Sequence, residues 1–506
     1  MFTEFVNNVL ATMAYLFVWT LGLTVIVVLV MFVIDVSQTT HAVRRNFPVI
    51  GRFRYFFEHL GEFFRPYFFA MDREEMPFNR AERAWVYRAA KGDDQTVAFG
   101  STRDLRVPGT VLFLNSPVPV LDGDAGDLPE VVIGPQTRQP YATRHFFHVS
   151  GMSFGAISKP AVQALSAGAR RAGVWMNTGE GGLSPYHLEG GADIVFQIGT
   201  AKYGVRDAQG YLSDERLRTI AEHAQVRMFE LKLSQGAKPG KGGILPGVKV
   251  TEEIARIRFI APGQDSLSPN RHPEIQSVDD LLDVIGHIRE VTGKPTGFKA
   301  VIGAHDWLDE LCEAIRRRGR EHAPDFITVD SGDGGTGAAP LSLIDSVGLP
   351  LKEGLPLVVD ALIRHGLRDR VKVIASGKMI TPTPVAWALC MGADFVVSAR
   401  GFMFALGCIQ SLQCNKNTCP TGITTHDQRL QRGLVLPDKT ERVHRYAEAM
   451  HHEVSIIAHS CGLPSPRGFG RRHVRIVQAN GLSVPLVQLH PEPTTLHGVR
   501  SEQASG

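Results

Sequence analysis

One unit repeats between about residues 145 and 400: a short apolar run, a loop that contains glycine, and then a helical segment. Strands that alternate with helices in this way imply a parallel sheet. Glycine motifs follow many of the strands, whereas an open doubly wound sheet concentrates its motif after the first strand. The pattern therefore favours an α/β fold with a closed (β/α)8 TIM barrel, and the open sheet is the alternative. The runs expected to form strands are residues 146–150, 228–233, 297–302, 326–329, 371–375 and 394–397.

Half of the six cysteines lie near the end of this repeat, in residues 399–420. Cys408, Cys414 and Cys419 form a C-x5-C-x4-C motif that is closed by Pro420. Thiolates are soft ligands, and spaced cysteines followed by proline are typical of iron–sulfur sites. Three cysteines favour a [3Fe-4S] cluster, because structural zinc needs four ligands. Three buried thiols without a metal are the remaining alternative.

Two glycine loops follow the last two expected strands. They are Ser376-Gly377-Lys378 and Ala399-Arg400-Gly401. In TIM barrels a phosphate commonly lies at the loops after strands seven and eight, on helix N-termini. Glycine lets backbone N–H groups approach the phosphate, and Lys378 or Arg400 can add charge. Tight turns that bind nothing are the alternative. We expect a helix over residues 401–412, which places Cys408 ~10–12 Å along it from the phosphate end.

The N-terminal segment is apolar. Residues 5–34 contain no Asp, Glu, Lys or Arg. A helix needs about 20 apolar residues to cross a bilayer, so we expect a transmembrane anchor within residues 1–40. A cleaved signal peptide is disfavoured, because Glu4 is the only charge before the apolar run. Lys and Arg favour the cytoplasmic side, so the following arginines predict a single-pass membrane protein with a cytoplasmic catalytic domain. They are Arg44, Arg45, Arg52 and Arg54.

The remaining boundaries follow from composition. Residues 41–125 are expected to be a partly helical extension, residues 126–465 the barrel with the cysteine loop, and residues 466–506 a tail. Residues 53–69 are rich in aromatics and arginine, which fits either an amphipathic segment on a membrane or a partner subunit, or a helix packed on the barrel. The net charge of +3 gives no indication of nucleic-acid binding. A basic run in the tail is expected to form a solvated face: Arg467, Arg471, Arg472 and Arg475.

Six blocks of this sequence, in order, resemble the synthase domain of glutamate synthase. The resemblance covers about residues 145–430, and the ordered set is far more specific than any one block. The blocks are G-M-S-F-G-A-I-S (151–158), N-T-G-E-G-G (177–182), K-L-S-Q-G-A-K-P-G-K-G-G-I-L-P-G (232–247), D-G-G-T-G-A-A-P (333–340), G-L-R-D-R-V (366–371) and G-C-I-Q-S-L-Q-C-N-K-N-T-C-P-T-G-I (407–423).

The resemblance implies that the phosphate at the two glycine loops belongs to FMN. Met152, Ser153 and Gly155 would then line one edge of the flavin. Lys299 would lie near the N1–C2 edge, where a cation stabilises the reduced, anionic flavin.

The resemblance also implies a site for 2-oxoglutarate and 2-iminoglutarate. Lys232, Gln235 and Lys238 lie close together in a glycine-containing loop, and two lysines with an amide suit a small dicarboxylate. Arg258 is a further candidate for binding a carboxylate, and Glu180 is the acid expected near the amine.

The sequence also departs from the family pattern. It begins Met1-Phe2-Thr3, where processed large glutamate synthases begin with a nucleophilic cysteine, so we expect a short form without a glutaminase domain. Residues 330–333 read D-S-G-D where the family commonly has S-G-H-D, and Lys241 replaces a common glutamate. These departures leave the nitrogen donor open.

The main hypothesis is an FMN- and iron–sulfur-dependent oxidoreductase that reduces an imine of 2-oxoglutarate and ammonia to L-glutamate. It would need an electron donor protein or a reduced cofactor, and a homo-oligomer is left open. One alternative is an amine-transferring enzyme of the N-methylglutamate synthase kind, with no net redox change. Another is a non-catalytic membrane electron-transfer subunit, which the retained Glu180, Lys232, Gln235 and Lys238 disfavour.

Overall fold

The computed structural model describes residues 1–495 of the chain. These residues form two compact units that divide between Ala81 and Glu82. The boundaries that composition predicts, near residues 40, 125 and 465, stay predictions.

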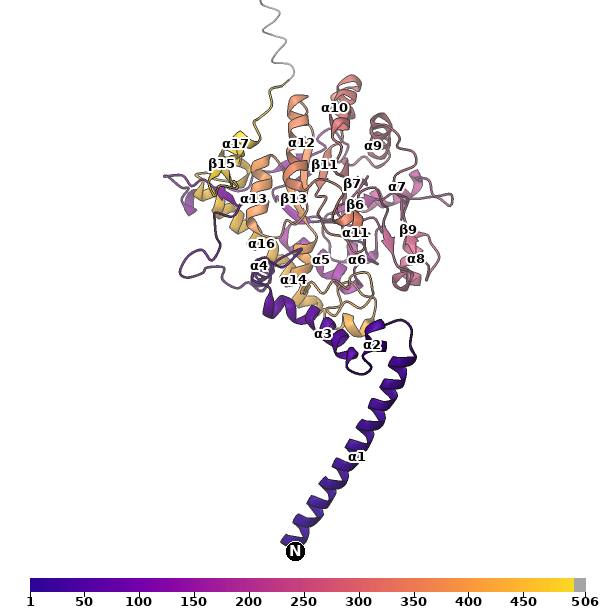
Figure 1. Ribbon diagram of the computed structural model, residues 1–506. Helices are drawn as coiled ribbons and strands as arrows, with labels where there is room; N and C mark the ends of the chain where they lie inside the picture. The colour runs from indigo at the N-terminus through magenta and orange to yellow at the C-terminus, as the bar shows by residue number, and fades with distance from the viewer. Residues whose placement is uncertain (496–506) are drawn as a thin grey trace, which may run out of the picture. The chain divides into compact units, whose positions relative to one another are not determined.

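The second unit is built on a closed barrel of eight parallel strands (Figure 1). Each strand pairs with its neighbours in chain order, and the last strand pairs with the first through Val396 and Phe147. This closure confirms the TIM-barrel prediction and rules out the open sheet. The strands are β4 (Phe147–Val149), β5 (Met176–Asn177), β6 (Ile194–Ile198), β7 (Val226–Lys232), β10 (Thr296–Val301), β11 (Phe326–Asp330), β12 (Lys372–Ser376) and β13 (Phe395–Ser398).

Two of the eight strands, β5 and β6, were not expected from the sequence. β5 has two residues, so it shows neither alternation nor a long apolar run. β6 is apolar and fully buried but is interrupted by Gln197, and it follows a glycine-rich stretch.

Helices surround the barrel, and those between β4 and β13 connect its strands (Figure 1). The longer ones are α5 (Lys159–Ala172), α7 (Asp214–Glu222), α9 (Val278–Thr292), α10 (Asp306–Arg318), α12 (Leu351–Arg364), α13 (Pro382–Met391) and α16 (Leu436–Ser460). The shorter ones are α6 (Pro185–Glu189), α8 (Glu252–Arg258), α11 (Leu341–Ile344), α14 (Arg400–Leu406), α15 (Gln428–Gln431) and α17 (Leu486–Leu489).

The N-terminal end of the barrel is closed by a hairpin. Strands β2 (Val131–Ile133) and β3 (Tyr141–Thr143) pair antiparallel. Ile133 and Tyr141 belong to the same buried cluster as residues at the starts of barrel strands, such as Phe326 and Phe395. Because apolar side chains fill this end, the opposite end, where the strands finish, is left for the functional loops.

The helix after the last barrel strand is shorter than the expected 401–412. α14 ends at Leu406, because Gly407 adopts a left-handed conformation with φ of 109° and donates its N–H back to the Phe404 carbonyl. Glycine tolerates this conformation best, so it is a common helix terminator. Cys408 therefore begins a loop rather than continuing the helix.

The C-terminal basic run is partly buried, which corrects the expectation of a solvated face. Strand β14 (Val474–Val477) pairs with β1 (Val111–Phe113) and β15 (Ser483–Pro485). Just before β14, Arg471 is 3% exposed and forms an ion pair with Asp360. The pairing partner lies more than a hundred residues earlier, so charge composition alone did not reveal it.

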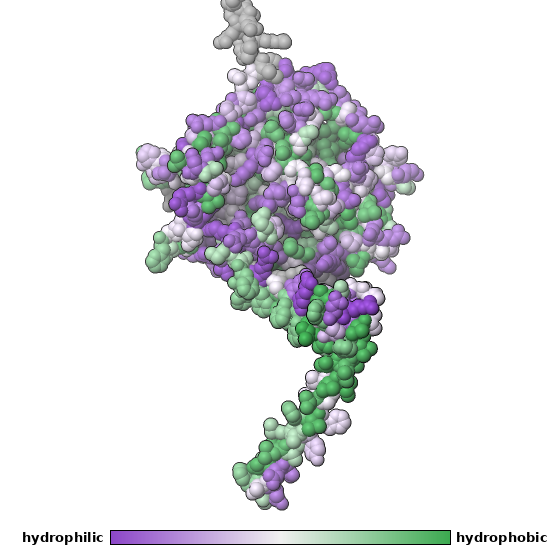
Figure 2. All heavy atoms as spheres, in the orientation of Figure 1, coloured by the Kyte–Doolittle hydropathy of each residue, from purple (hydrophilic) through white to green (hydrophobic). Residues whose placement is uncertain are grey.

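The first unit begins with α1 (Phe2–Ser37), which is green (hydrophobic) along most of its length in Figure 2. Of the described helices, α1 alone is long and apolar enough to be a candidate membrane span. Three shorter elements follow: α2 (Ala42–Asn46), α3 (Gly51–Phe64) and η1 (Arg65–Phe69). Helix α4 (Arg80–Lys91) begins two residues before the division, and the second unit also contains the β8–β9 hairpin (Ile244–Leu245 and Ser266–Leu267).

Candidate active site

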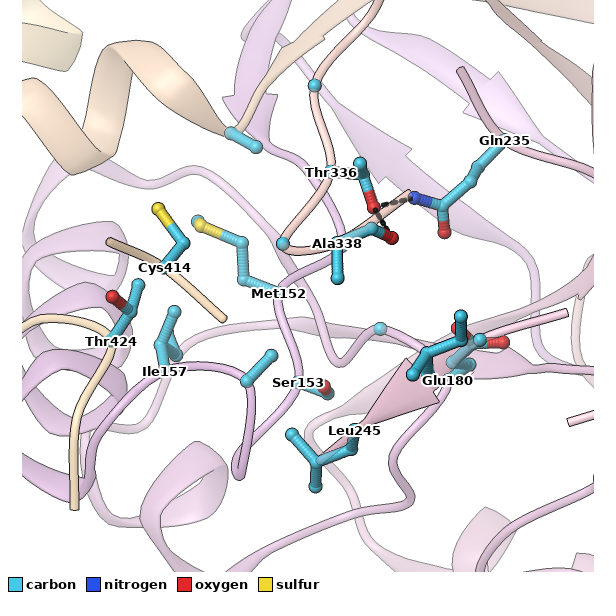
Figure 3. A pocket seen from close by; sticks show the side chains of 18 of the residues that line it. Met152, Ser153, Ile157, Glu180, Gln235, Leu245, Thr336, Ala338, Cys414 and Thr424 are labelled. Atoms are coloured by element: carbon cyan, nitrogen blue, oxygen red, sulfur yellow. Dashed lines mark hydrogen bonds between the residues drawn. The ribbon is translucent and has the colours of Figure 1, made fainter. Parts of the chain in front are cut away.

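A cavity lies at the carboxyl ends of the barrel strands and includes about 1000 Å³ of space, counting the part open to solvent. Its walls come from loops far apart in the sequence, because parallel strands bring all their carboxyl ends to one face. In Figure 3, Cys414 and Thr424 lie on one side, Gln235 and Glu180 on the other, and Met152 and Ser153 between them.

The cavity is strongly cationic. Among its lining residues, Glu180 is the one acid. A site with this imbalance attracts anions, and low-dielectric walls strengthen the attraction. The cations that line the cavity are Lys232, Lys238, Lys249, Arg258 and Arg400.

Glu180 and Lys232 form an ion pair of 2.8 Å. Burial alone would raise the pKa of Glu180, but the ammonium groups of Lys232 and Lys238 outweigh it and lower that pKa. Lys232 also donates to the side-chain oxygen of Gln235, whose nitrogen donates to Thr336 Oγ1 at 3.1 Å. The predicted acid and three predicted side chains of the substrate loop thus lie in one cavity, with Glu180 ionised.

Lys238 is buried and donates to the carbonyl of Ala338 at 3.3 Å. Burial, reinforced by the nearby charge of Lys232, lowers the pKa of Lys238 to about 8. It forms no ion pair with any carboxylate in the described part of the chain. An anion in the cavity would therefore find this ammonium uncompensated.

Arg258 is 4% exposed and reaches the cavity from α8. Its guanidinium donates to Ser266 Oγ at 3.2 Å and to Ser153 Oγ at 3.4 Å, and lies 5.2 Å from the Tyr203 ring centre. Within residues 1–495, its Nε has no hydrogen-bond partner. Burial lowers the pKa of Arg258.

Lys299 lies inside the barrel rather than at its mouth, where it lines a second, smaller cavity. Its Nζ pairs with Asp330 at 3.0 Å. Burial disfavours the charged lysine, but the carboxylates of Asp330 and Glu230 outweigh it and raise the pKa of Lys299. Asp330 is one of the residues that depart from the family pattern, and here it provides the partner of the predicted flavin lysine.

The two predicted phosphate loops are closely packed. A Cβ on Gly377, which has φ of 127°, would lie 2.2 Å from Ser331 Cβ, and one on Gly401 would lie 2.1 Å from the Tyr446 hydroxyl. Ser376 donates to Asp330, and Lys378 forms an ion pair of 2.8 Å with Asp333. Neither glycine can be replaced without displacing a neighbour.

The predicted cofactor residues are not all brought to the same place. Those that line the large cavity are Met152, Ser153, Ala399 and Arg400. Gly155 is buried beside Arg258, so a side chain there would contact the guanidinium. Gly377, Lys378 and Gly401 lie at the adjacent strand ends, outside the residues that line the cavity.

The three predicted cluster cysteines are unpaired and lie in the loop after α14. The Cys414 sulfur is 3.9 Å from Arg400 Nη1, and the Cys408 sulfur accepts the N–H of Gln410 at 3.5 Å. Burial would raise the pKa of Cys419, but hydrogen bonds from Thr421 and Thr424 lower it. Each sulfur thus has a neighbouring donor.

The cysteine loop does not form a site for a single metal ion. In residues 1–495, no three His, Cys, Asp or Glu side chains converge on one ion. Gln410, Leu412 and Asn417 all have positive φ between 55° and 61°, which is uncommon for residues other than glycine. Such strain is concentrated at functional sites.

Sequence reasoning missed a buried network beneath the cavity. Glu230 accepts hydrogen bonds from Asn177, Gln197 and Thr328 at 2.6–2.9 Å. Gln197 also lines the large cavity. The signal in the sequence was a polar residue, Gln197 or Glu230, inside an otherwise apolar strand. A buried carboxylate needs several hydrogen-bond partners, so such a residue indicates a buried polar network.

Residues 118–464 match the family model described as a conserved region in glutamate synthase. The match covers well over half of the chain. The chain belongs to the glutamate synthase family. The predicted family and its class, a glutamate-synthase-like oxidoreductase, are therefore confirmed.

Curated relatives agree with this assignment. The chain is 39% identical over 509 residues to the glutamate synthase large subunit-like protein YerD of Bacillus subtilis, covering 93% of this chain and 94% of that protein. It is 34% identical over 316 residues to the archaeal-type glutamate synthase [NADPH] of Thermotoga maritima, covering 62% of this chain and 59% of that one.

Solved structures are more distant. A flavocytochrome b2 mutant with pyruvate bound has 15% identity and a TM-score of 0.45, with 87% of this chain and 92% of that chain covered. A mandelate oxidase structure has 18% identity and the same TM-score, with 78% and 98% covered. At this level the likeness adds nothing to the functional argument.

Proposed function

We propose that this protein uses FMN and a [3Fe-4S] cluster to reduce the imine of 2-oxoglutarate and ammonia to L-glutamate. The observation that carries the proposal is the cationic cavity with a single ionised acid, Glu180, beside the cysteine loop. When bound, FMN would supply the two electrons for the imine carbon, and the cluster would be the route by which electrons reach the flavin. In sum, 2-oxoglutarate and ammonia lose water to form the imine, which gains two electrons and two protons to become glutamate.

The cavity cations account for substrate binding. Lys238 and Arg258 carry charge that no carboxylate in the described chain neutralises by an ion pair, so each can bind one carboxylate of a dicarboxylate by charge-assisted hydrogen bonds. Lys232 is shared between Glu180 and Gln235, and it holds the acid in place.

Glu180 is placed to handle the nitrogen. Its carboxylate is ionised and hydrogen-bonded to Lys232 at Oε1. It can accept a proton from ammonium, so that neutral ammonia attacks the keto carbon, and return a proton to the nitrogen during reduction. The nearby lysines keep it ionised between turnovers.

The residues present fit FMN. Ala399 and Arg400 line the large cavity, so the Arg400 guanidinium can bind the phosphate there, whereas a Cβ on Gly377 or Gly401 would meet Ser331 or Tyr446 rather than open space. Met152, Ser153 and Gly155 come from the loop after the first strand. Lys299 would act on the flavin from below the cavity with its charge partly balanced by Asp330.

The cysteines also fit a cluster better than a single ion. Structural zinc needs four ligands around one point. In a cluster each of Cys408, Cys414 and Cys419 would hold a different iron, so the three sulfurs would not need to converge on one point. Hydrogen bonds lower the pKa of Cys419 and favour its thiolate, the form that iron requires, whereas burial raises the pKa of Cys408.

We further propose that α1 anchors the protein in a membrane with the catalytic unit in the cytoplasm. Its apolar stretch is exposed, so within residues 1–495 these side chains have no protein cover. Arginines dominate the charge of the segment that follows, which favours the cytoplasmic side.

The decisive assay supplies 2-oxoglutarate and isotopically labelled ammonia, with and without a chemical reductant. Labelled glutamate should form only with the reductant. Lys238→Met should lose most activity, whereas Lys241→Met, which removes an exposed lysine of the same loop, should not. Failure of the wild-type protein to form labelled glutamate overturns the proposal. Glutamate formed from an amine donor without reductant would establish the transferase alternative instead.

A further inference from the structure

Lys249 is a buried lysine that the proposed reaction does not use. It ends the short helix η3 (Gly247–Lys249) and is 2% exposed. Its Nζ donates to the carbonyl of Ala156 at 2.6 Å and to the carbonyl of Cys414 at 3.3 Å. A single side chain therefore joins the loop after the first barrel strand to the cysteine loop.

The two loops that Lys249 joins also touch directly. Ser158 N–H donates to the Ile423 carbonyl at 2.8 Å, and His426 Nε2 lies 2.9 Å from the Gly155 carbonyl. Lys249 differs from these contacts because it approaches from a third loop, the one that carries Lys238. The Lys249 ammonium thus contacts both the loop after the first barrel strand and the cysteine loop, and it belongs to the substrate loop. One ammonium group therefore holds these three loops together.

The charge of Lys249 has no carboxylate partner in the described part of the chain, where its two hydrogen bonds go to neutral carbonyls. Burying an ammonium is costly unless it is paired with an opposite charge. The loop that it contacts carries the Cys414 and Cys419 sulfurs, which would be anionic as thiolate ligands of a cluster. An anionic group bound at the cysteines would therefore lie close to a buried positive charge that no carboxylate balances.

We infer that Lys249 is a positioning residue that holds Cys414 against the loop after the first barrel strand and raises the reduction potential of the cluster. This inference rests on the proposed function for the presence of the cluster. A nearby cation stabilises the more negative, reduced form, and charge near a cluster is one of the factors that set its potential.

The test compares three full-length variants: Lys249→Met, Lys249→Arg and Lys241→Met. The cluster's midpoint potential is measured by EPR during a redox titration, and hydrogen exchange is measured across residues 151–158 and 408–424. Lys249→Met should lower the potential and speed exchange in both loops. Lys249→Arg keeps the charge and should restore most of the potential. Lys241→Met should match the wild type.

The outcomes separate the inference from the proposed function. An unchanged potential in a Lys249→Met protein that retains its cluster overturns the electrostatic role, and unchanged exchange overturns the positioning role. If Lys249→Met assembles no cluster, Lys249→Arg decides. A cluster potential close to that of the wild type in Lys249→Arg supports the inference, and a potential well below that of the wild type overturns it. If the wild type itself holds no cluster, the proposed cofactor is wrong, and the exchange comparison alone decides whether Lys249 joins the loops.

Discussion

Binding of 2-oxoglutarate should depend on the protonation of Lys238. Burial, with the charge of Lys232, lowers the pKa of Lys238 to about 8, and the side chain lies in the cationic cavity without a carboxylate partner. The protonated form donates a charge-assisted hydrogen bond to a carboxylate, worth about 1.5–3 kcal/mol. Its loss in Lys238→Met should weaken binding roughly 10- to 150-fold, at about 1.4 kcal/mol per factor of ten.

The sign of the pH effect follows from the direction of this shift. Below pH 8 most Lys238 is charged and the affinity should be nearly constant. As the pH rises through 8 the ammonium loses its proton, so the affinity of the wild type should fall by about tenfold between pH 7 and pH 9. The dicarboxylate itself stays ionised throughout this range.

Isothermal titration of the FMN-loaded protein with 2-oxoglutarate, at pH 7, 8 and 9, checks this prediction. Lys241→Met is the matched control, since it removes an exposed lysine three residues away. Because the charge of Lys241 helps to lower the pKa of Lys238, the drop in this variant should keep its size and move to a slightly higher pH. Lys238→Met should bind weakly at every pH and lack the drop above pH 8. A drop of equal size in Lys238→Met would show that another group, such as Lys249, titrates instead. A wild-type affinity that does not change from pH 7 to 9 would refute the reasoning.

Other substitutions test the remaining parts of the site. Gly377→Asp should abolish FMN binding, because its Cβ would lie 2.2 Å from Ser331 Cβ and its carboxylate beside the phosphate; flavin released by acid from the variant and the wild type measures this. Cys414→Ser should remove the cluster's EPR signal and leave FMN bound, and retention of full donor-dependent turnover would make the cluster structural. Glu180→Gln should reduce glutamate formation by about 10²–10⁴-fold if Glu180 transfers protons, with 2-oxoglutarate binding largely kept. Truncation before residue 40 should yield protein that stays in the supernatant after centrifugation and binds FMN, and a folded but flavin-free product would show that the N-terminal segment does more than anchor.

The barrel and much of the candidate site could be predicted from the sequence, because both depend on local patterns. Apolar runs followed by glycine loops place functional residues at the carboxyl ends of strands whatever the details of packing. Lys232, Gln235, Lys238 and Glu180 share one cavity for this reason. The strand β5 was not predicted, because its two residues are too few to show a periodic pattern.

The partners of buried charges could not be predicted in the same way. Lys299 pairs with Asp330, Arg471 with Asp360, and Lys249 with the carbonyls of Ala156 and Cys414. These contacts join residues that are 31 to 165 positions apart in the sequence, so no local sequence pattern contains both partners. A charged side chain looks the same in the sequence whether it faces water or a buried partner. Only the tertiary structure decides which, since burial is favourable only where folding brings a compensating group within hydrogen-bond distance.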